Sequence, residues 1–334
     1  MNEIIYAPVV IPTLNRFEHF KRCIESLEKC TGAEHTEVFV GLDYPPSDRY
    51  RKGWEQIGEY LSFKEKQNGF KKLHIIRRNH NYGVGKRGSN MEMLINDISK
   101  VFDCYILTED DNEFSPCFLQ YMNKALEKFY DDDRIFLVCG YNYKMTFPEM
   151  YRNSYYISKH GCPWGTGEWF HKRKDYQELY DLDVLKKILK DDTTYHTLMK
   201  RSPHVIHSII SQLKNGVLWG DAIKGLYVAL KDKYCIMPRV SMVRNWGNDG
   251  TGEHSKRMNN EQNDFYTTQP ISNELYFEFT DDIFTYEPVF LERHHYSQKK
   301  NLYVSLRKLH SDLKFKLDIF LFRKFNYLPK SRWI

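Results

Sequence analysis

The first 140 residues alternate short apolar runs with segments whose apolar residues recur at helical spacing. The runs are typical of buried strands, and the segments between them of covering helices. This alternation favours an α/β fold with a mostly parallel twisted sheet flanked by helices. The expected strands are 6–12, 37–42, 73–77, 104–108 and 135–139.

Helix starts can be predicted from capping residues. Asn15, followed by Glu18 three residues later, resembles a capping box for a first helix. Ser115 and Pro116 suit a cap and first position of a later helix. Apolar spacing predicts further helices around 54–61, 91–98, 183–190, 203–213 and 221–230.

The chain beyond residue 140 is less regular. A Gly/Trp-rich loop over 160–170 and a Gly-rich loop over 245–254 are expected, with short strands at 235–237 and 241–244. No linker or repeat separates the halves. We therefore expect one domain over 1–285, with halves 1–140 and 141–285, followed by an extension over 286–334.

Composition narrows the class of protein. With 334 residues, 41% of them apolar, a large core can form. The seven Cys contain no C-x-x-C pair, which predicts reduced thiols in the cytoplasm. No signal peptide or spanning apolar run is expected. The net charge of +5 is concentrated after Lys299, a distribution that argues against a nucleic-acid binder.

The strongest local signal is the acidic triplet Glu109, Asp110 and Asp111 at the end of an apolar strand. Ligands of parallel sheets bind beyond the carboxyl ends of the strands. Adjacent carboxylates repel unless they are solvated or share a cation, and a divalent ion with oxygen ligands would recruit a diphosphate. The alternative is a solvated turn that caps the following helix.

Two other strand ends carry polar segments. Residues 9–16 end the first strand with a Pro-Thr-Leu-Asn-Arg run, and residues 78–90 combine glycines with cations before a helix. Flexible backbone and cations at a helix N-terminus suit phosphate.

Together these segments resemble the GT-A glycosyltransferases, including the large family 2 group. In that group Pro-Thr ends the first strand, an Asp follows the second, and an Asn-x-Gly segment ending in Arg-x-x-Asn precedes the third helix. The resemblance implies nucleotide-sugar binding by Pro12, Thr13, Arg16, Asp43, Gly83, Lys86, Arg87, Asn90, Glu109 and Asp110.

The metal motif departs from the family 2 pattern. It looks like the acidic triplet of the Golgi N-acetylglucosaminyltransferase that initiates complex N-glycans, which implies that Asp111 holds the metal. Residues 218–221 and 239–247 resemble segments of the same enzyme, the first of which carries its base. That likeness makes Asp221 the expected base, and the metal would be Mn²⁺ or Mg²⁺.

The resemblance implies transfer, with inversion, from a nucleoside-diphosphate sugar, expected to be a UDP-sugar. The enzyme would be a hexosyltransferase or N-acetylhexosaminyltransferase of surface-polysaccharide synthesis, and the acceptor a hydroxyl of a saccharide or glycolipid. Asp221 would remove the acceptor proton, or else it caps a helix. Glu168 is the competing base. His254 is either a second metal ligand or a surface residue.

Rival functions remain open from the sequence. A sugar-nucleotide pyrophosphorylase has the same α/β architecture, but residues 9–16 lack its Gly-rich loop. A non-catalytic nucleotide- or glycan-binding protein would not need Asp111 and Asp221 together. Trp164 and Trp169 suit either an acceptor platform or a core.

The C-terminal extension predicts a basic helix with one apolar stripe. It is readable as a peripheral anchor on the inner face of the membrane or as a helix docked on its own domain. The stripe consists of Leu302, Leu306, Leu309, Leu313, Leu317 and Phe320.

Overall fold

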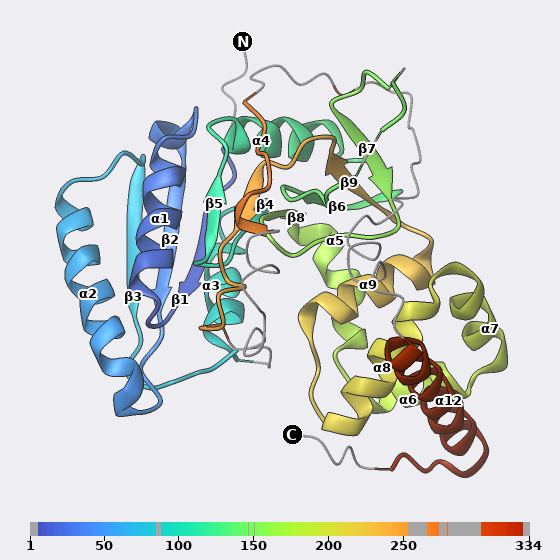
Figure 1. Cartoon of the computed structure of the whole chain (residues 1–334). Coiled ribbons are helices and arrows are strands. Elements are labelled where there is room, and N and C mark those ends of the chain that lie inside the picture. The colour runs from blue at the N-terminus through green and yellow to red at the C-terminus, as the bar shows by residue number, and fades with distance from the viewer. Residues whose placement is uncertain are drawn as a thin grey trace. The chain divides into compact units, whose positions relative to one another are not determined.

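The computed structural model describes residues 6–84, 88–145, 147–149, 151–252, 266–273, 279 and 302–329, the last stretch with side chains for 311 and from 313 on. The chain forms two compact units (Figure 1). The first contains the described residues of 1–142, 147–173 and 234–287, and the second those of 143–146, 174–233 and 288–334.

A mostly parallel sheet organises the first unit, which confirms the α/β prediction. Among the described residues its strand order is β3-β2-β1-β4-β8-β6-β9-β7, with β7 and β8 antiparallel to their neighbours. The strands are β1 (Val9–Thr13), β2 (Glu37–Leu42), β3 (Lys72–Arg77), β4 (Cys104–Leu107), β6 (Ile135–Cys139), β7 (Tyr155–Ser158), β8 (Thr166–Trp169) and β9 (Tyr234–Pro238).

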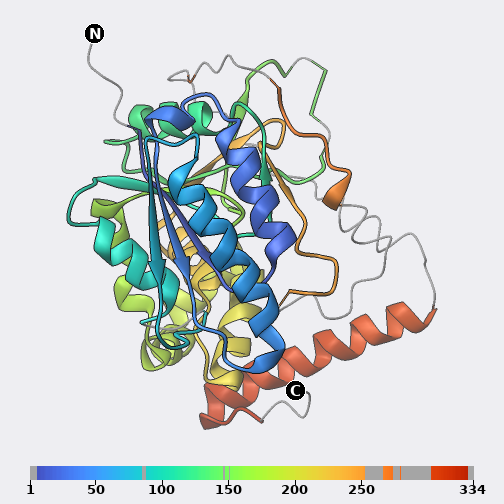
Figure 2. The same cartoon turned by 90° about the vertical axis from the view of Figure 1, so that its left-hand side faces the viewer.

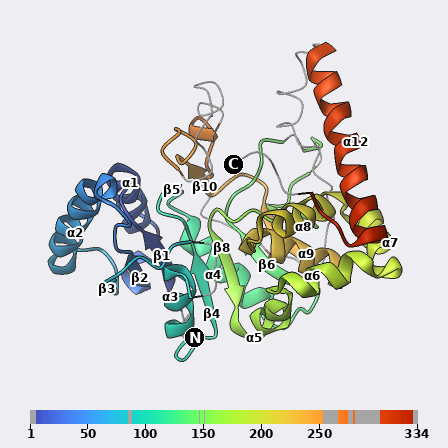
Figure 3. The same cartoon turned by 90° about the horizontal axis from the view of Figure 1, so that it is seen from below.

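Helices cover both faces of β1–β4 because successive strand residues point to opposite faces. On one face Val10 and Tyr105 form a core with Leu94 of α3 (Asn90–Ile98). On the other, α1 and α2 lie side by side (Figure 2), and Figure 3 shows the strands between these helices and α3. The other helices of this unit are α1 (Phe17–Glu28), α2 (Arg51–Lys66), α4 (Phe118–Lys128), α5 (Phe170–Arg173), η1 (Ala33–His35) and η2 (Asp48–Tyr50).

Both predicted helix starts were wrong in detail. The N-cap of α1 is Arg16, and no side chain caps it, so Asn15 and Glu18 form no capping box. Helix α4 begins at Phe118, two residues after the predicted start. The hydroxyl of Ser115 instead accepts a hydrogen bond from the Cys117 amide at 3.1 Å, which forms a turn before the helix.

Short strands were missed where the sequence suggested loops. Residues 160–170 contain β8, which pairs antiparallel with β4 although its own sequence, Thr-Gly-Glu-Trp, has little strand character. Strand β5 (Asn112–Phe114) was missed in the same way. It pairs antiparallel with β10 (Val243–Asn245), which overlaps the strand predicted at 241–244, and Asn245 lies opposite Asn112. Tertiary pairing decides such short strands, and β propensity alone does not predict them.

The second unit is helical in its described part. It contains η3 (Lys174–Leu179), α6 (Leu182–Lys190), α7 (Asp192–Arg201), α8 (Pro203–Asn215), α9 (Gly220–Lys231) and α12 (Leu302–Phe325), the helix predicted in the extension. Within the described chain, no helix has the length and apolarity needed to cross a bilayer. All seven Cys are free thiols.

Candidate functional site

The strand order places two polar strand ends side by side. Strands β2 and β3 lie on one side of β1, whereas β4 lies on the other, so the topology switches direction between β1 and β4. Val9 of β1 pairs with Ile106 of β4 in parallel register. The carboxyl ends of both strands therefore meet at the place where open α/β sheets bind ligands.

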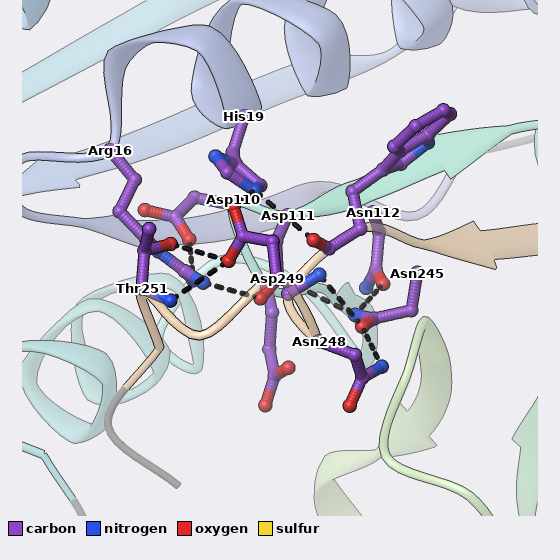
Figure 4. A network of polar contacts seen from close by, with 12 residues as sticks. Arg16, His19, Asp110, Asp111, Asn112, Asn245, Asn248, Asp249 and Thr251 are labelled. Carbon is purple, nitrogen blue, oxygen red and sulfur yellow. Dashed lines mark hydrogen bonds and ion pairs between the residues drawn. The ribbon is translucent and has the colours of Figure 1, made fainter. Parts of the chain in front are cut away.

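Residues from these two strand ends form one polar network (Figure 4). The Thr13 hydroxyl donates to Asp110 Oδ2 at 2.7 Å. The Arg16 guanidinium contacts Asp110 Oδ1 at 2.5 Å and Asp111 Oδ2 at 2.8 Å. Asp110 and Asp111 are each 6% exposed, so a single arginine links two buried carboxylates.

The β5–β10 ribbon brings a distant segment over the acidic pair. Asn245 Nδ2 donates to Asp111 Oδ1 at 2.8 Å and to Asn112 Oδ1 at 2.9 Å. The Trp246 amide donates to the Asp111 carbonyl at 2.9 Å. A Cβ on Gly247 would overlap Asp111 Oδ2, so only glycine lets the chain pass this close to the carboxylate.

A second ring of contacts surrounds this centre. His19 Nε2 lies 3.1 Å from the Trp246 carbonyl and 3.2 Å from Asp249 Oδ2. Thr251 donates to Asp249 Oδ1 from its amide at 2.9 Å and from its hydroxyl at 2.7 Å. The Arg22 guanidinium stacks over the Trp246 ring, 4.0 Å from its centroid. These contacts tie α1 to residues 246–251.

Burial and charge oppose each other at Asp111. Burial raises the pKa of Asp111, the nearby Arg16 charge lowers it, and repulsion from Asp110 raises it, so that it stays above the ordinary 3.8. Burial lowers the pKa of Arg16, but the charges of Asp110 and Asp111 more than offset this, and its pKa is raised. One guanidinium therefore faces two carboxylates, which leaves a residual negative charge.

Asp43 follows β2 and has a different set of partners. It is 5% exposed. Its Oδ1 accepts from the amides of Tyr44 and Tyr82 at 3.0 Å each, and its Oδ2 from the Gly83 amide at 2.9 Å and from Asn81 Nδ2 at 3.3 Å. Asp43 thus fastens the loop after β3 to the end of β2.

Asn90, another predicted donor-site residue, is buried at the start of α3. Its Nδ2 donates to the Gly41 carbonyl at 2.7 Å, and its Oδ1 accepts from Arg78 Nε at 2.9 Å. Pro12 lies within β1, opposite Gly41 in β2. Lys86 and Arg87 lie outside the described residues.

Four other residues singled out from the sequence differ in how deeply they are buried. Glu109 is exposed, unlike its two acidic neighbours. Glu168 is 2% exposed in β8, opposite Tyr105 of β4, and its Oε1 accepts from the Thr166 hydroxyl at 3.3 Å. Trp169 is fully buried and donates to the Leu126 carbonyl at 2.9 Å, which makes it a core residue. Trp164 is only partly buried, and its ring packs edge-on against Tyr141.

Asp221 belongs to the second unit. It is exposed in the first turn of α9, whose N-cap is Trp219, so it is not the capping residue itself. An acidic residue in a first turn is favoured by the helix dipole whatever else it does. His254 lies outside the described residues.

Asp110 and Asp111 suit a divalent cation that a bound diphosphate also coordinates. In the described chain, no three His, Cys, Asp or Glu side chains are arranged to hold a metal ion by themselves. Mg²⁺ commonly binds through one or two carboxylates together with substrate phosphates. Asp110 and Asp111 supply hard oxygen ligands with excess negative charge, and Arg16 would have to release Asp111 for a cation to bind there.

Sequence reasoning missed His19 and Asp249. His19 lies three residues after Arg16, and this helical spacing could have placed both on the face of α1 that meets the strand ends. Asp249 was part of the predicted Gly-rich loop, but its pairing with His19 joins residues 230 apart in the chain. Only the β5–β10 ribbon brings the two segments together.

Comparison with known proteins gives only remote similarities. No protein family and no curated protein matches the sequence. The structure is similar to a mannosyltransferase, PcManGT from Pyrobaculum calidifontis, solved with GDP-Man and Mn²⁺, with a TM-score of 0.36 and 12% identity over 68% of this chain and 69% of that one. It is also similar to residues 1–349 of S. aureus TarS, with a TM-score of 0.40 and 11% identity over 95% and 80%. Scores this low define no family, so function must be inferred from the chain's own residues.

Proposed function

We propose that the protein is a glycosyltransferase of the GT-A type that uses a nucleoside-diphosphate sugar, with a UDP-sugar as donor. The observation that carries the proposal is the pair of buried carboxylates, Asp110 and Asp111, at the switch point between β1 and β4. They lie beside Thr13 and Arg16, residues that the resemblance assigns to donor binding.

The chain's residues have separate roles in this proposal. Asp111, with Asp110 beside it, would hold Mn²⁺ or Mg²⁺, which would neutralise the departing diphosphate when bound. Arg16 keeps the two carboxylates paired before the donor arrives and is then free to face the diphosphate. Asn245 orients Asp111 through its other oxygen, and glycine at 247 lets the chain lie against the carboxylate without a clash.

Asp43 and Asn90 would support donor binding indirectly. Both oxygens of Asp43 accept from the loop after β3, so it shapes the loop in which the resemblance places the nucleotide. Lys86, Arg87 and His254 remain proposed contacts of the donor or the metal. We also propose 1–140 as the donor half and 141–285 as the acceptor half of the catalytic domain.

For the base we propose Asp221. Its exposed carboxylate is accessible to an acceptor hydroxyl, whereas Glu168 is buried within the sheet. Removal of the acceptor proton as the new bond forms would give transfer with inversion. The acceptor we propose is a saccharide carried on a lipid, in surface-polysaccharide synthesis at the cytoplasmic face of a membrane. The sugar transferred is a hexose or an N-acetylhexosamine.

The donor site can be tested by thermal unfolding with nucleotides, with and without Mn²⁺. A nucleotide at 100 times its dissociation constant adds about 2.7 kcal/mol to the free energy of unfolding. We expect UDP with Mn²⁺ to stabilise the wild type and to have no effect on Asp111→Ala. The matched control is Asp103→Asn, an exposed acid at the opposite end of β4, which should respond like the wild type.

The outcomes of this screen distinguish the proposed enzyme from the alternatives. Stabilisation by GDP or another nucleotide instead of UDP would keep the enzyme class but correct the donor. No stabilisation of the wild type by any nucleotide would leave the acidic pair as a structural clamp held by Arg16. Stabilisation without hydrolysis or transfer of any sugar nucleotide would indicate a binding protein.

Asp221 has a closely matched control in Asp183, which occupies the same second helical position in α6. Loss of a general base costs about 10²–10⁴-fold in rate. We expect Asp221→Asn to lose transfer by this factor while its nucleotide binding and stability stay unchanged, and Asp183→Asn to transfer normally. A large loss in Glu168→Gln with an active Asp221→Asn would instead assign the base to Glu168.

A further inference from the structure

The tail helix α12 has apolar residues on two opposite faces. One face contains Phe315, Ile319 and Phe322, which follow the i, i+4, i+7 spacing of a helix face. The opposite face carries Leu313, Leu317 and Phe320, at the same spacing. The leucine stripe in the sequence predicted one apolar face, and its members with described side chains, Leu313, Leu317 and Phe320, are exposed.

The first of these faces is docked within the second unit. Ile319 and Phe322 are 9% and 2% exposed, and Phe315 stacks on His207 of α8. Asp318 is buried in an ion pair with Lys214. Arg323 completes the contact by donating to the Leu189 carbonyl at 2.7 Å. In Figure 3 the C-terminal part of α12 lies beside the other helices of the unit, and its N-terminal part extends away from them.

The opposite face is exposed and basic. Leu313, Leu317 and Phe320 are 56%, 54% and 53% exposed. Exposed lysines border them at 314, 316 and 324. Among the side chains described from 313 to 329, the only acidic one is Asp318, and it is buried with its lysine on the other face. Packing within the unit therefore explains one face and leaves an apolar stripe with a positive rim.

We propose that this face of α12, which we name the 313–324 face, binds an anionic lipid surface. Apolar side chains flanked by lysines let a helix lie in the membrane interface, with its apolar residues inserted and its cations at the headgroups. Docking of the opposite face presents the stripe outward without requiring the helix to leave its unit. The inference uses only α12 and does not depend on the reaction proposed for the first unit.

Vesicle co-sedimentation of the full chain tests the proposal. We expect binding to phosphatidylcholine vesicles that contain phosphatidylglycerol, little binding to phosphatidylcholine alone, and weaker binding at high salt. Each lysine near such a surface contributes about 1 kcal/mol, or roughly fivefold. Lys314→Gln with Lys316→Gln should therefore weaken binding by roughly 25-fold.

The apolar stripe is tested by a second double variant. Leu317→Ser with Phe320→Ser should weaken binding at least roughly tenfold, because both side chains would lose apolar burial. Matched controls come from the same unit: Lys200→Gln with Lys231→Gln for charge, and Met199→Ser with Val217→Ser for exposed apolar surface. These controls should bind vesicles like the wild type. Far-UV circular dichroism checks that each variant keeps its helices.

Three results would overturn the proposal. The first is equal vesicle binding by the wild type and both test variants. The second is binding to a soluble polyanion such as heparin that is as strong as binding to the vesicles, because no apolar insertion is then involved. The third is a dimer in light scattering that Leu317→Ser with Phe320→Ser converts to a monomer, because a second copy would then cover the face.

Discussion

Two strand ends of the first unit both bury acidic residues, yet they satisfy them differently. Asp43, after β2, accepts three backbone amides and one asparagine side chain. Asp110 and Asp111, after β4, accept mainly from side chains, those of Thr13, Arg16 and Asn245. Backbone donors are fixed by the fold, whereas side chains can rotate away. The comparison indicates that Asp43 holds the structure together and that the β4 pair can exchange partners with a ligand.

The largest effect expected from this comparison is that of Arg16→Met. Removing one partner of a buried ion pair typically costs about 3–5 kcal/mol, because a charge is left uncompensated. Mn²⁺ should restore much of the lost stability by taking the place of the guanidinium, and it should stabilise the variant more than the wild type. Urea denaturation with and without Mn²⁺ measures both effects.

Arg51→Met is the control for that variant, because Arg51 pairs with Asp48 on the surface, where such pairs are worth about 0–1 kcal/mol. A loss below about 1 kcal/mol in Arg16→Met would show that the β4 pair is well solvated without its arginine. The contrast with Asp43 would then disappear.

The next largest loss of stability is expected for Asp43→Ala. It leaves the Tyr82 and Gly83 amides without their acceptor, at about 1–3 kcal/mol for each group that stays buried. No metal should repair this loss, since the missing partner is an acceptor. The same denaturation series checks it, with the exposed Asp48→Ala as control. If Mn²⁺ restored the stability of Asp43→Ala, the metal would bind at the end of β2 and not at the end of β4, which would contradict our proposal.

Gly247→Ala tests how tightly the β10 segment covers Asp111. The added Cβ would overlap Asp111 Oδ2, and overpacking of this kind typically costs about 1–3 kcal/mol. Gly58→Ala in α2 meets no atom within 4 Å and should stabilise the helix by about 0.5–1 kcal/mol. Opposite signs in the two variants are expected in thermal or urea unfolding. An equal gain in both would mean that residues 246–248 are held loosely over the acid.

The smallest effect concerns pH. Because burial raises the pKa of Asp111 above 3.8, its contribution to stability is full below that pH and is lost as the pH rises through the raised value. The stability of the wild type relative to Asp111→Asn should therefore fall as the pH increases above 3.8 in the absence of metal. A relative stability that rises with pH would mean that Arg16 outweighs burial at this carboxylate. Urea denaturation across this pH range distinguishes the two.

Much of the first unit was predictable because its signals are local. The apolar runs gave β2 and β6 at their observed limits, and helical spacing placed α3 to within a residue at each end. In the second unit, helical spacing placed α9 equally closely. The predicted cap of α1 was wrong because no side chain caps this helix, and the predicted cap of α4 was wrong because Ser115 forms a turn with the Cys117 amide before the helix begins. The ribbon of β5 and β10 was not predicted as a pair, since its partners lie far apart in the sequence.

The sequence by itself determined the class of fold and the presence of acidic residues at the end of β4, because periodicity and strand-end composition are read within a few residues. Tertiary structure alone decided that Arg16 bridges Asp110 and Asp111, and that Asn245, 134 residues further along the chain, and Gly247 come to Asp111. It also decided which face of α12 packs, because two apolar stripes of similar spacing differ only in the surface each one meets.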